Sequence, residues 1–162
     1  MTLPAEVLAH CERLPKKPAE VVLAGSKVEL RPLTDADFEP LHRVSNGQPF
    51  ALGDRRVEAY DPDDLIWKWM KGGPFATVAA LRADHAPHAA SDDTRMMTVL
   101  VDHVPVGVAC FMTNRPRDLK IELGAIWYGP IAQGTGASRE VTMLMLGHAF
   151  ELGYRRVEWK CD

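Results

Sequence analysis

The sequence has no long hydrophobic run, no cluster of basic residues and few cysteines, and each lack excludes a class of protein. No window approaches the roughly 18 apolar residues of a membrane-spanning helix, and the first residues lack the basic segment and apolar run of a secretory signal. The net charge is −3 and no block of Lys and Arg stands out. We therefore expect no membrane association and no direct nucleic-acid binding.

Neither the cysteines nor the histidines form a recognisable pattern. Cys11, Cys110 and Cys161 are odd in number, far apart and without a C-x-x-C pair. This usage indicates reduced thiols in a cytoplasmic protein. His85 and His88 lie close together in the sequence but have no third ligand nearby, so we expect no metal site.

Length and composition indicate one globular domain behind an N-terminal arm. The chain has 162 residues, of which 46% are hydrophobic and 25% charged. These values are typical of a globular protein that buries its own core. Residues 1–20 are rich in Pro, Lys and Glu and predict an arm with one short helix, whereas residues 21–162 predict a single domain.

Apolar periodicity and turn residues predict a mixed α/β fold. In chain order they predict a hairpin over 21–32, a helix from Thr34 to 46–47, a helix over 61–72, a short helix over 75–81 and a polar loop over 83–94. A hairpin over 96–112, a strand over 119–128, a helix ending at Gly153 and a strand over 154–160 follow. The apolar stripe of the helix over 61–72 consists of Leu65, Ile66, Trp69 and Met70. The last two strands flank one long helix and should be parallel, joined by a right-handed crossover. We expect a sheet of antiparallel strands with one parallel pair near its end.

The glycine-rich turn before the last helix is the most informative motif. Glycines there would let an anion approach the unpaired N–H groups at the positive end of the helix, as a diphosphate does. A Walker loop needs a Lys after the last Gly, and a dinucleotide fingerprint needs Gly or Ala where Arg139 stands. An ordinary turn between strand and helix is the alternative. The turn consists of Gln133, Gly134, Thr135, Gly136, Ala137 and Ser138.

The residues around the turn decide between these readings. A strand over 121–128, the turn, a helix containing Glu140 and the segment 149–158 follow one another in an order that resembles the GCN5-related N-acetyltransferase (GNAT) superfamily. The opening segment 28–34 with Asp37 is similar to the branch of ribosomal-protein N-terminal acetyltransferase-like enzymes. The resemblance covers roughly residues 20–162, and it implies the GNAT fold and acetyl-CoA as donor substrate, with no metal.

The resemblance also assigns the coenzyme A site. It implies that residues 133–138 bind the pyrophosphate, although Ser138 stands where the family has Gly or Ala. Ile126 and Trp127 match the strand whose backbone pairs with the pantetheine arm. The strands at 119–128 and 154–160 should splay apart there and leave room for the acyl group.

Acetyl transfer needs a base for the amine, and family members commonly add an acid for the departing thiolate. Glu122 is the candidate base; an exposed strand glutamate or an ion pair with Arg115 or Arg117 is the alternative. The tyrosine that protonates the thiolate lies in a helix expected after Asp162, so the chain reads as truncated there. Tyr128 and Tyr154 could replace that tyrosine as the acid, although packing within their strands would also explain both residues. Of the two, Tyr128 is the catalytic candidate.

The acceptor is a primary amine, either a protein N-terminus or a small amine. Trp67 and Phe75 lie where related enzymes line the acceptor site, although such residues are also typical of a core. Two alternatives remain open: a non-catalytic module that binds coenzyme A or dimerises, and an inactive fragment of such an enzyme. The open edge of the final strand predicts a homodimer.

Overall fold

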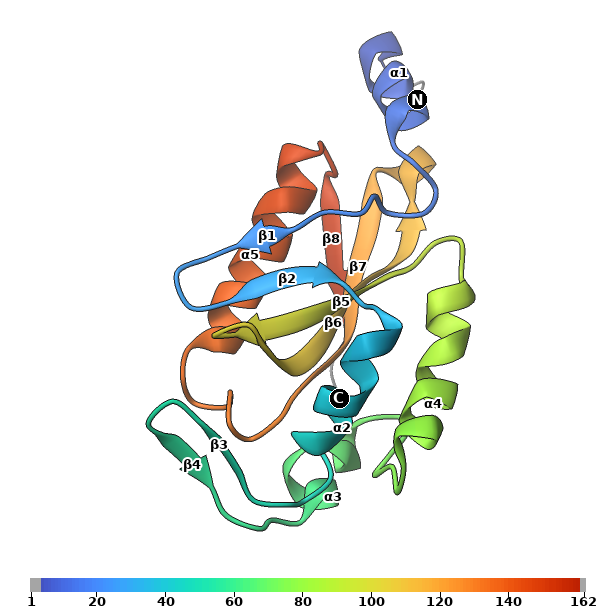
Figure 1. Cartoon of the computed structure of the whole chain (residues 1–162). Coiled ribbons are helices and arrows are strands. Elements are labelled where there is room, and N and C mark those ends of the chain that lie inside the picture. Colours follow the sequence, from blue (N-terminus) through green and yellow to red (C-terminus); the bar gives the residue numbers. More distant parts are fainter. Residues whose placement is uncertain (1–3, 161–162) are drawn as a thin grey trace.

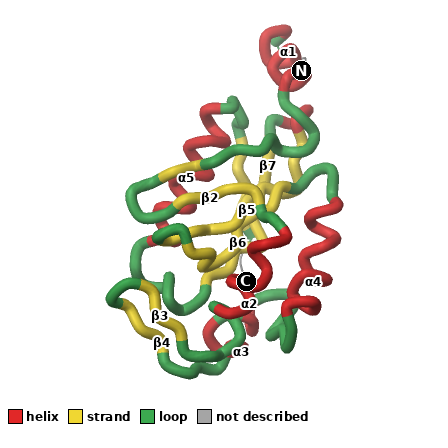
Figure 2. The backbone as a smooth tube through the Cα atoms, in the orientation of Figure 1, coloured by secondary structure: helices red, strands yellow, loops and turns green. Residues whose placement is uncertain are grey.

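The computed structural model describes residues 4–160, so Cys161 lies outside the described residues. A six-stranded sheet forms the centre, with helices on both of its faces and α1 set apart at one end (Figure 1, Figure 2). A separate hairpin, β3–β4, lies beside it. The helices, with short 3-10 segments labelled η, are α1 Ala5–Arg13, η1 Asp35–Asp37, α2 Phe38–Arg43, α3 Pro62–Leu65, η2 Trp67–Trp69, α4 Val78–Ala90, η3 Pro116–Asp118 and α5 Ala137–Glu151. The strands are β1 Leu23–Ala24, β2 Glu29–Pro32, β3 Phe50–Leu52, β4 Arg55–Val57, β5 Arg95–Val101, β6 Val104–Arg115, β7 Lys120–Tyr128 and β8 Arg156–Trp159.

The sheet confirms the predicted mixed architecture. Its strand order is β1-β2-β5-β6-β7-β8, and every pair is antiparallel except β7 with β8. Asp102 and His103 close the β5–β6 hairpin with φ angles of 49° and 63°, as a tight two-residue turn requires. α5 connects the parallel pair, as expected from the two strands that flank one long helix.

An irregularity in β7 decides which way its side chains face. The register with β6 shifts between Val108 and Cys110, and Ala125 of β7 has a φ of 48°. Before the shift Leu123 packs on the α5 side of the sheet, and after it Trp127 packs on the side of α2 and α4. A regular strand would turn these two residues to the same face. The bulge therefore changes the face on which odd-numbered residues lie.

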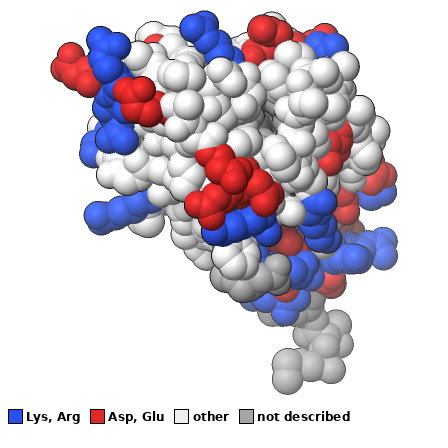
Figure 3. All heavy atoms as spheres, turned by 90° about the horizontal axis from the view of Figure 1, so that it is seen from below, with Lys and Arg blue, Asp and Glu red and all other residues white. Residues whose placement is uncertain are grey.

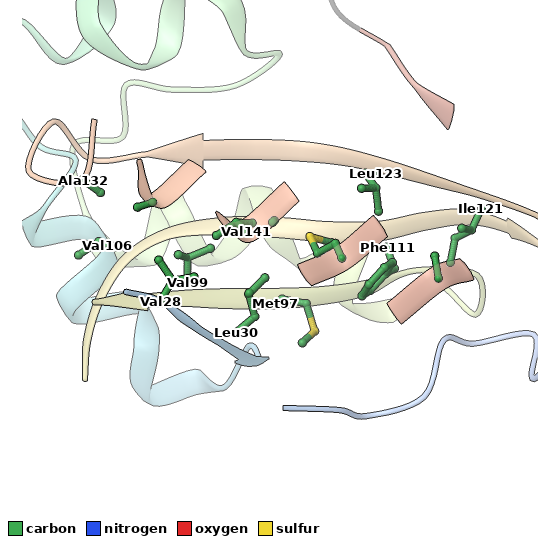
Figure 4. Close-up of a cluster of buried hydrophobic side chains, with 14 of the residues drawn as sticks. Val28, Leu30, Met97, Val99, Val106, Phe111, Ile121, Leu123, Ala132 and Val141 are labelled. Atoms are coloured by element: carbon green, nitrogen blue, oxygen red, sulfur yellow. The ribbon is translucent and has the colours of Figure 1, made fainter. Parts of the chain in front are cut away.

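Two hydrophobic clusters cover the two faces. On one face Val141 and Met145 of α5 pack against strand residues such as Leu30, Val99 and Leu123 (Figure 4). On the other, a second cluster joins α2, η2 and α4 to the strands; its buried members are Phe38, Leu41, Ile66, Trp67, Leu81, Met96, Val108, Cys110 and Trp127. Met143 and Phe150 of α5 are exposed.

A capping box joins Thr34 and Asp37 at the start of η1. Thr34 N–H and its hydroxyl both donate to the Asp37 carboxylate, at 2.8 and 2.9 Å. Arg31 donates to both carboxylate oxygens, and Thr98 of β5 donates to one of them. Asp37 is buried, so this network ties the start of the first helical segment to the sheet.

The region between residues 61 and 94 differs from the prediction. The expected helix over 61–72 is two short pieces, α3 and η2, because the chain breaks at Ile66. Trp67 turns inward against Phe75 and Trp127, whereas Trp69 is 74% exposed. Burying one indole between two aromatic rings outweighs continuing a regular helix.

The predicted polar loop over 83–94 is also wrong, because residues 78–90 form α4. Thr77 caps this helix by accepting a hydrogen bond from the N–H of Ala80, and Pro87 lies in its last turns. The hairpin β3–β4 was not predicted at all.

The N-terminal helix expected in the arm is α1. Val7 and Cys11 pack on Leu119, and the imidazole Nε2 of His10 lies 2.7 Å from the carbonyl of Leu152 at the end of α5. The domain boundary at residue 20 stays a prediction.

On the face seen in Figure 3, acidic and basic side chains lie next to each other. Over residues 4–160, none of the helices has the length and apolar character needed to span a bilayer.

Candidate active site

The glycine turn at residues 133–138 leads into α5 and presents free backbone N–H groups. Gly134 and Gly136 have φ angles of 71° and 86°, which glycine adopts without strain. A Cβ at Gly134 would meet no atom within 4 Å. Within residues 4–160, the N–H groups of Gly134, Thr135 and Gly136 make no hydrogen bond to the protein. With the unpaired N–H groups of the first turn of α5, they can converge on an anion.

The other members of the turn hold its shape. Thr135 Oγ1 accepts from the N–H of Ala137 at 3.1 Å. The Gln133 amide donates to the carbonyls of Leu65 and Tyr128, both at 3.0 Å, and so fixes the turn against the end of β7. Ala137 is buried and Ser138 is exposed, so the serine hydroxyl does not crowd the protein side of the turn.

Two cations that the sequence did not single out flank the turn. Lys27 Nζ donates to the carbonyl of Thr135 at 3.2 Å, and it lies 3.5 Å from where a Cβ on Gly136 would stand. Arg55 donates to the carbonyl of Gln133 at 3.1 Å. They come from the β1–β2 turn and from β4, and no local spacing in the sequence relates them to residues 133–138. Positive charge thus surrounds the free N–H groups.

Glu140 fixes the position of Lys27. Its carboxylate accepts the N–H groups of Ser26, Lys27 and Val28 at 2.6, 2.8 and 3.1 Å and the Ser26 hydroxyl at 2.7 Å. The hydrogen bonds from Ser26, then those from the following N–H groups, lower the pKa of Glu140 below its ordinary value. The first turn of α5 therefore holds the β1–β2 turn beside the free N–H groups.

The edge of β7 beyond Leu123 is open. β8 pairs with Lys120 to Leu123 only, so residues 124–128 have no partner strand on that side in the part of the chain described. Ile126 and Trp127 lie on this unpaired stretch. β8 ends at Trp159, beside Leu123, so in the described part of the chain an extended ligand could add to the free edge of residues 124–128. The splay of the two strands stays a prediction.

Glu122 lies where the parallel pairing is about to end. It is 5% exposed, and Lys160, the first residue after β8, donates to its Oε2 at 2.6 Å. Its antiparallel partner on β6 is Met112, a member of the second cluster, so the carboxylate faces the side of α2 and α4. From the sequence, Arg115 and Arg117 are the candidate ion-pair partners of Glu122, but in the structure its partner is Lys160.

Tyr128 lies at the far end of β7 from Glu122. It packs with the first cluster, on the α5 side, and its hydroxyl is buried without a hydrogen-bond partner. Burial raises the pKa of Tyr128 above its ordinary value. Six residues of strand, about 20 Å, separate the two, so the structure does not bring the two catalytic candidates together.

The aromatic residues predicted for the acceptor site gather on the face of Glu122. The Trp67 ring lies 4.9 Å from that of Phe75 and 5.0 Å from that of Trp127, measured between centroids. Trp67 is buried and donates to the carbonyl of Ser45 at 3.2 Å. Phe75 is half-buried. The structure thus gives Trp67 a core role and leaves Phe75 nearer the surface.

His85 joins this aromatic group, although the sequence placed it in a loop. Its ring meets those of Phe38, Phe75 and Trp127 edge-on, with centroids 5.9 to 6.5 Å apart. Nδ1 is buried without a hydrogen bond, although Asp84 lies at 3.3 Å. Burial lowers the pKa of His85, and the charge of Asp84 opposes this only in part. In residues 4–160 no group of three or more possible metal ligands occurs.

Comparison with known proteins identifies the family. A model of the acetyltransferase (GNAT) domain matches residues 27–162. The chain belongs to the GNAT family. A search of curated proteins gave no match.

Solved GNAT structures share the fold. A GCN5-related N-acetyltransferase from Brucella melitensis is 27% identical with a TM-score of 0.76, over 91% of this chain and 63% of that one. A probable GNAT acetyltransferase from Chromobacterium violaceum is 27% identical with a TM-score of 0.78, over 100% and 73%. A ribosomal L7/L12 α-N-protein acetyltransferase in complex with coenzyme A is 16% identical with a TM-score of 0.61, over 87% and 75%. The chain thus spans less than two thirds of the Brucella protein, and the predicted resemblance to GNAT proteins is confirmed.

Proposed function

We propose that this GNAT chain is an N-acetyltransferase that moves the acetyl group of acetyl-CoA to a primary amine by direct attack. The open turn at residues 133–138, flanked by Lys27 and Arg55, carries the proposal. The unpaired edge of β7 connects this turn to the buried carboxylate of Glu122.

Coenzyme A fits the order of these features. Its pyrophosphate would accept hydrogen bonds from the N–H groups of Gly134, Thr135 and Gly136 and from the first turn of α5. The pantetheine arm would extend from the turn along residues 124–128, with the backbone of Ile126 and Trp127 as its hydrogen-bonding partners. An extended arm of this length brings the thioester toward Glu122.

At the thioester end of the pantetheine arm, the site has to remove a proton from the acceptor amine and polarise the thioester carbonyl. Glu122 would take a proton from the acceptor ammonium, which otherwise has no lone pair for attack. A backbone N–H on the open stretch of β7 would stabilise the oxyanion of the tetrahedral intermediate. Phe75, and behind it Trp67, would line the approach of the acceptor.

A non-catalytic module that binds coenzyme A is the second candidate. The position of Tyr128 favours it, since that hydroxyl is buried on the opposite face from Glu122 and does not reach the same ligand atoms.

The cytoplasmic location expected from the cysteines also remains part of the proposal, and Cys11 and Cys110 are free and buried.

Two measurements test the proposal. Calorimetry should show that coenzyme A binds, and that Gly136→Val weakens binding because the new side chain fills the approach to the free N–H groups. Thiol release from acetyl-CoA, measured across peptides with free N-termini and small amines, should depend on the amine and fall roughly 100-fold in Glu122→Gln. Binding without amine-dependent release would favour the non-catalytic module, and no binding would refute both.

A further inference from the structure

The ion pair between Glu122 and Lys160 joins the proposed base to an amine of the same chain. Glu122 Oε2 and Lys160 Nζ are 2.6 Å apart. The Glu122 side chain is 6% exposed and that of Lys160 is 75% exposed. Lys160 thus reaches a buried carboxylate from the solvent side, as an acceptor amine from solution would.

Lys160 directly follows the last paired residues of the parallel strands. The last paired residues are Leu123 and Trp159, and Lys160 is the next residue of the chain. It therefore stands beside the beginning of the open edge of β7, where the proposed function puts the thioester. The neighbouring charges pair among themselves, because Glu158 accepts from Lys120 at 3.0 Å and from Arg156 at 3.1 Å.

We propose that Lys160 is an internal acceptor and becomes acetylated by acetyl-CoA bound to its own chain. The inference rests on the proposed function, because it needs both the bound thioester and Glu122 as base. The side chain belongs to the same chemical class as the acceptor, a primary amine. It already makes the hydrogen bond through which a base removes a proton.

The reaction balances with acetyl-CoA as the only co-reactant. Glu122 accepts a proton from the ammonium, and Nζ then attacks the thioester carbonyl carbon. A C–N bond forms, and collapse of the tetrahedral intermediate breaks the C–S bond. Of the two protons that nitrogen loses, one ends on the coenzyme A thiol and the other goes to solvent. The amide that results carries no charge, so the ion pair with Glu122 is lost.

Mass spectrometry tests this modification. The 162-residue chain would be incubated with acetyl-CoA alone, and the acetylated fraction of each lysine followed over time. We expect Lys160 to react far faster than exposed Lys16, which reports non-enzymatic acetylation. The rate per molecule should not depend on protein concentration, as for an intramolecular step. Labelling of Lys160 no faster than Lys16, or in proportion to protein concentration, would overturn the inference.

Variants separate the role of Glu122 from simple reactivity. Glu122→Gln keeps the size of the side chain and should slow the labelling of Lys160 roughly 100-fold, with Lys16 unchanged. Lys160→Arg keeps a cation and should abolish the mass increase that acetylation of residue 160 causes. Lys120→Arg, on the same side of the sheet, should leave that mass increase unchanged. If Glu122→Gln unfolds, competition by coenzyme A replaces it: labelling of Lys160 must fall as coenzyme A fills the site, and labelling that persists overturns the inference.

The outcome is distinguishable from failure of the proposed function. Binding of coenzyme A and amine-dependent thiol release, without labelling of Lys160, would overturn the internal acceptor and leave the enzyme assignment intact. Absence of coenzyme A binding would overturn both.

Discussion

The ammonium of Lys27 donates a hydrogen bond of 3.2 Å to the carbonyl of Thr135, 108 residues further along the chain. The contact places one positive charge beside free N–H groups that themselves attract an anion. The β1–β2 turn is therefore part of the proposed pyrophosphate site, and its contribution can be measured.

Lys27→Ala should weaken coenzyme A binding. A hydrogen bond to a charged group contributes about 1.5–3 kcal/mol, so we expect a loss of roughly 10- to 100-fold in affinity by calorimetry. Lys16→Ala is the matched control, because Lys16 forms an exposed ion pair with Asp92 that is worth little. Equal affinities for the two variants would remove Lys27 from the site.

Asp37→Ala should destabilise the fold strongly. The buried carboxylate accepts hydrogen bonds from Arg31, Thr34 and Thr98, and its loss leaves the buried Thr98 hydroxyl and the partly buried Arg31 guanidinium without this partner. Burial alone would raise the pKa of Asp37, but these hydrogen bonds outweigh burial and lower it. Removing one partner of such a pair costs about 3 kcal/mol or more, measurable by urea unfolding. Asp35→Ala, at an exposed pair with Arg82, should cost less than about 1 kcal/mol.

Stability should fall as the pH falls below about 6.5, through His85. Burial lowers the pKa of this imidazole below its value of 6.5 in an unfolded chain, so the unfolded state takes up a proton more readily. The contribution of His85 to the free energy of unfolding is complete above pH 6.5. It is lost as the pH falls toward the lower pKa that His85 has in the folded state. Urea midpoints at pH 7.5 and 5.5 measure the change. His85→Leu should reduce it without removing it, because burial also lowers the pKa of His148.

Gly147→Ala should stabilise the protein. Gly147 lies inside α5, its added Cβ would meet no atom within 4 Å, and its φ is not positive. Alanine in an exposed helix interior is better than glycine by about 0.5–1 kcal/mol, which thermal unfolding detects. Gly153→Ala is the opposite case, because Gly153 has a φ of 89° and its Cβ would run into the ring of His10. A lower melting temperature for Gly147→Ala would contradict the first expectation.

The homodimer expected at the sheet edge remains a prediction. β8 is an outermost strand of the sheet in the described part of the chain, and Trp159 on it is 50% exposed. We expect concentration-dependent dimers in sedimentation, weakened about tenfold or more by Trp159→Glu. Trp69→Glu changes an indole that is 74% exposed elsewhere and should have no effect. A monomer at high concentration would count against the dimer.

The sequence predicted the second half of the fold well, because local rules dominate there. Apolar, β-branched runs bounded by turn residues define β5 to β7, and Gly153 and the glycine turn bound α5. The first half depends on tertiary contacts. Trp67 breaks a helix to reach Trp127, and α4 tolerates Pro87 and polar residues that normally indicate a loop.

The site divides in the same way. The turn at residues 133–138 and Glu122 are visible as motifs, since their residue types and spacing carry the chemistry. Lys27, Arg55 and Lys160 are not, because only the folded chain brings them to the turn and to Glu122. Asp37 is an intermediate case: its capping box is readable, but Thr98 as a further donor is not.

The irregular residue in β7 sets a limit on how this strand can vary. If β7 kept every residue but paired with β6 without the bulge, plain alternation would exchange the faces of every residue from Ile126 onward. Trp127 would then leave the indole of Trp67 and press into the space of α5, while Glu122 stayed in place. Glu122 and the aromatic residues Trp67 and Trp127 therefore share one side of the sheet only as long as the bulge takes up the extra residue.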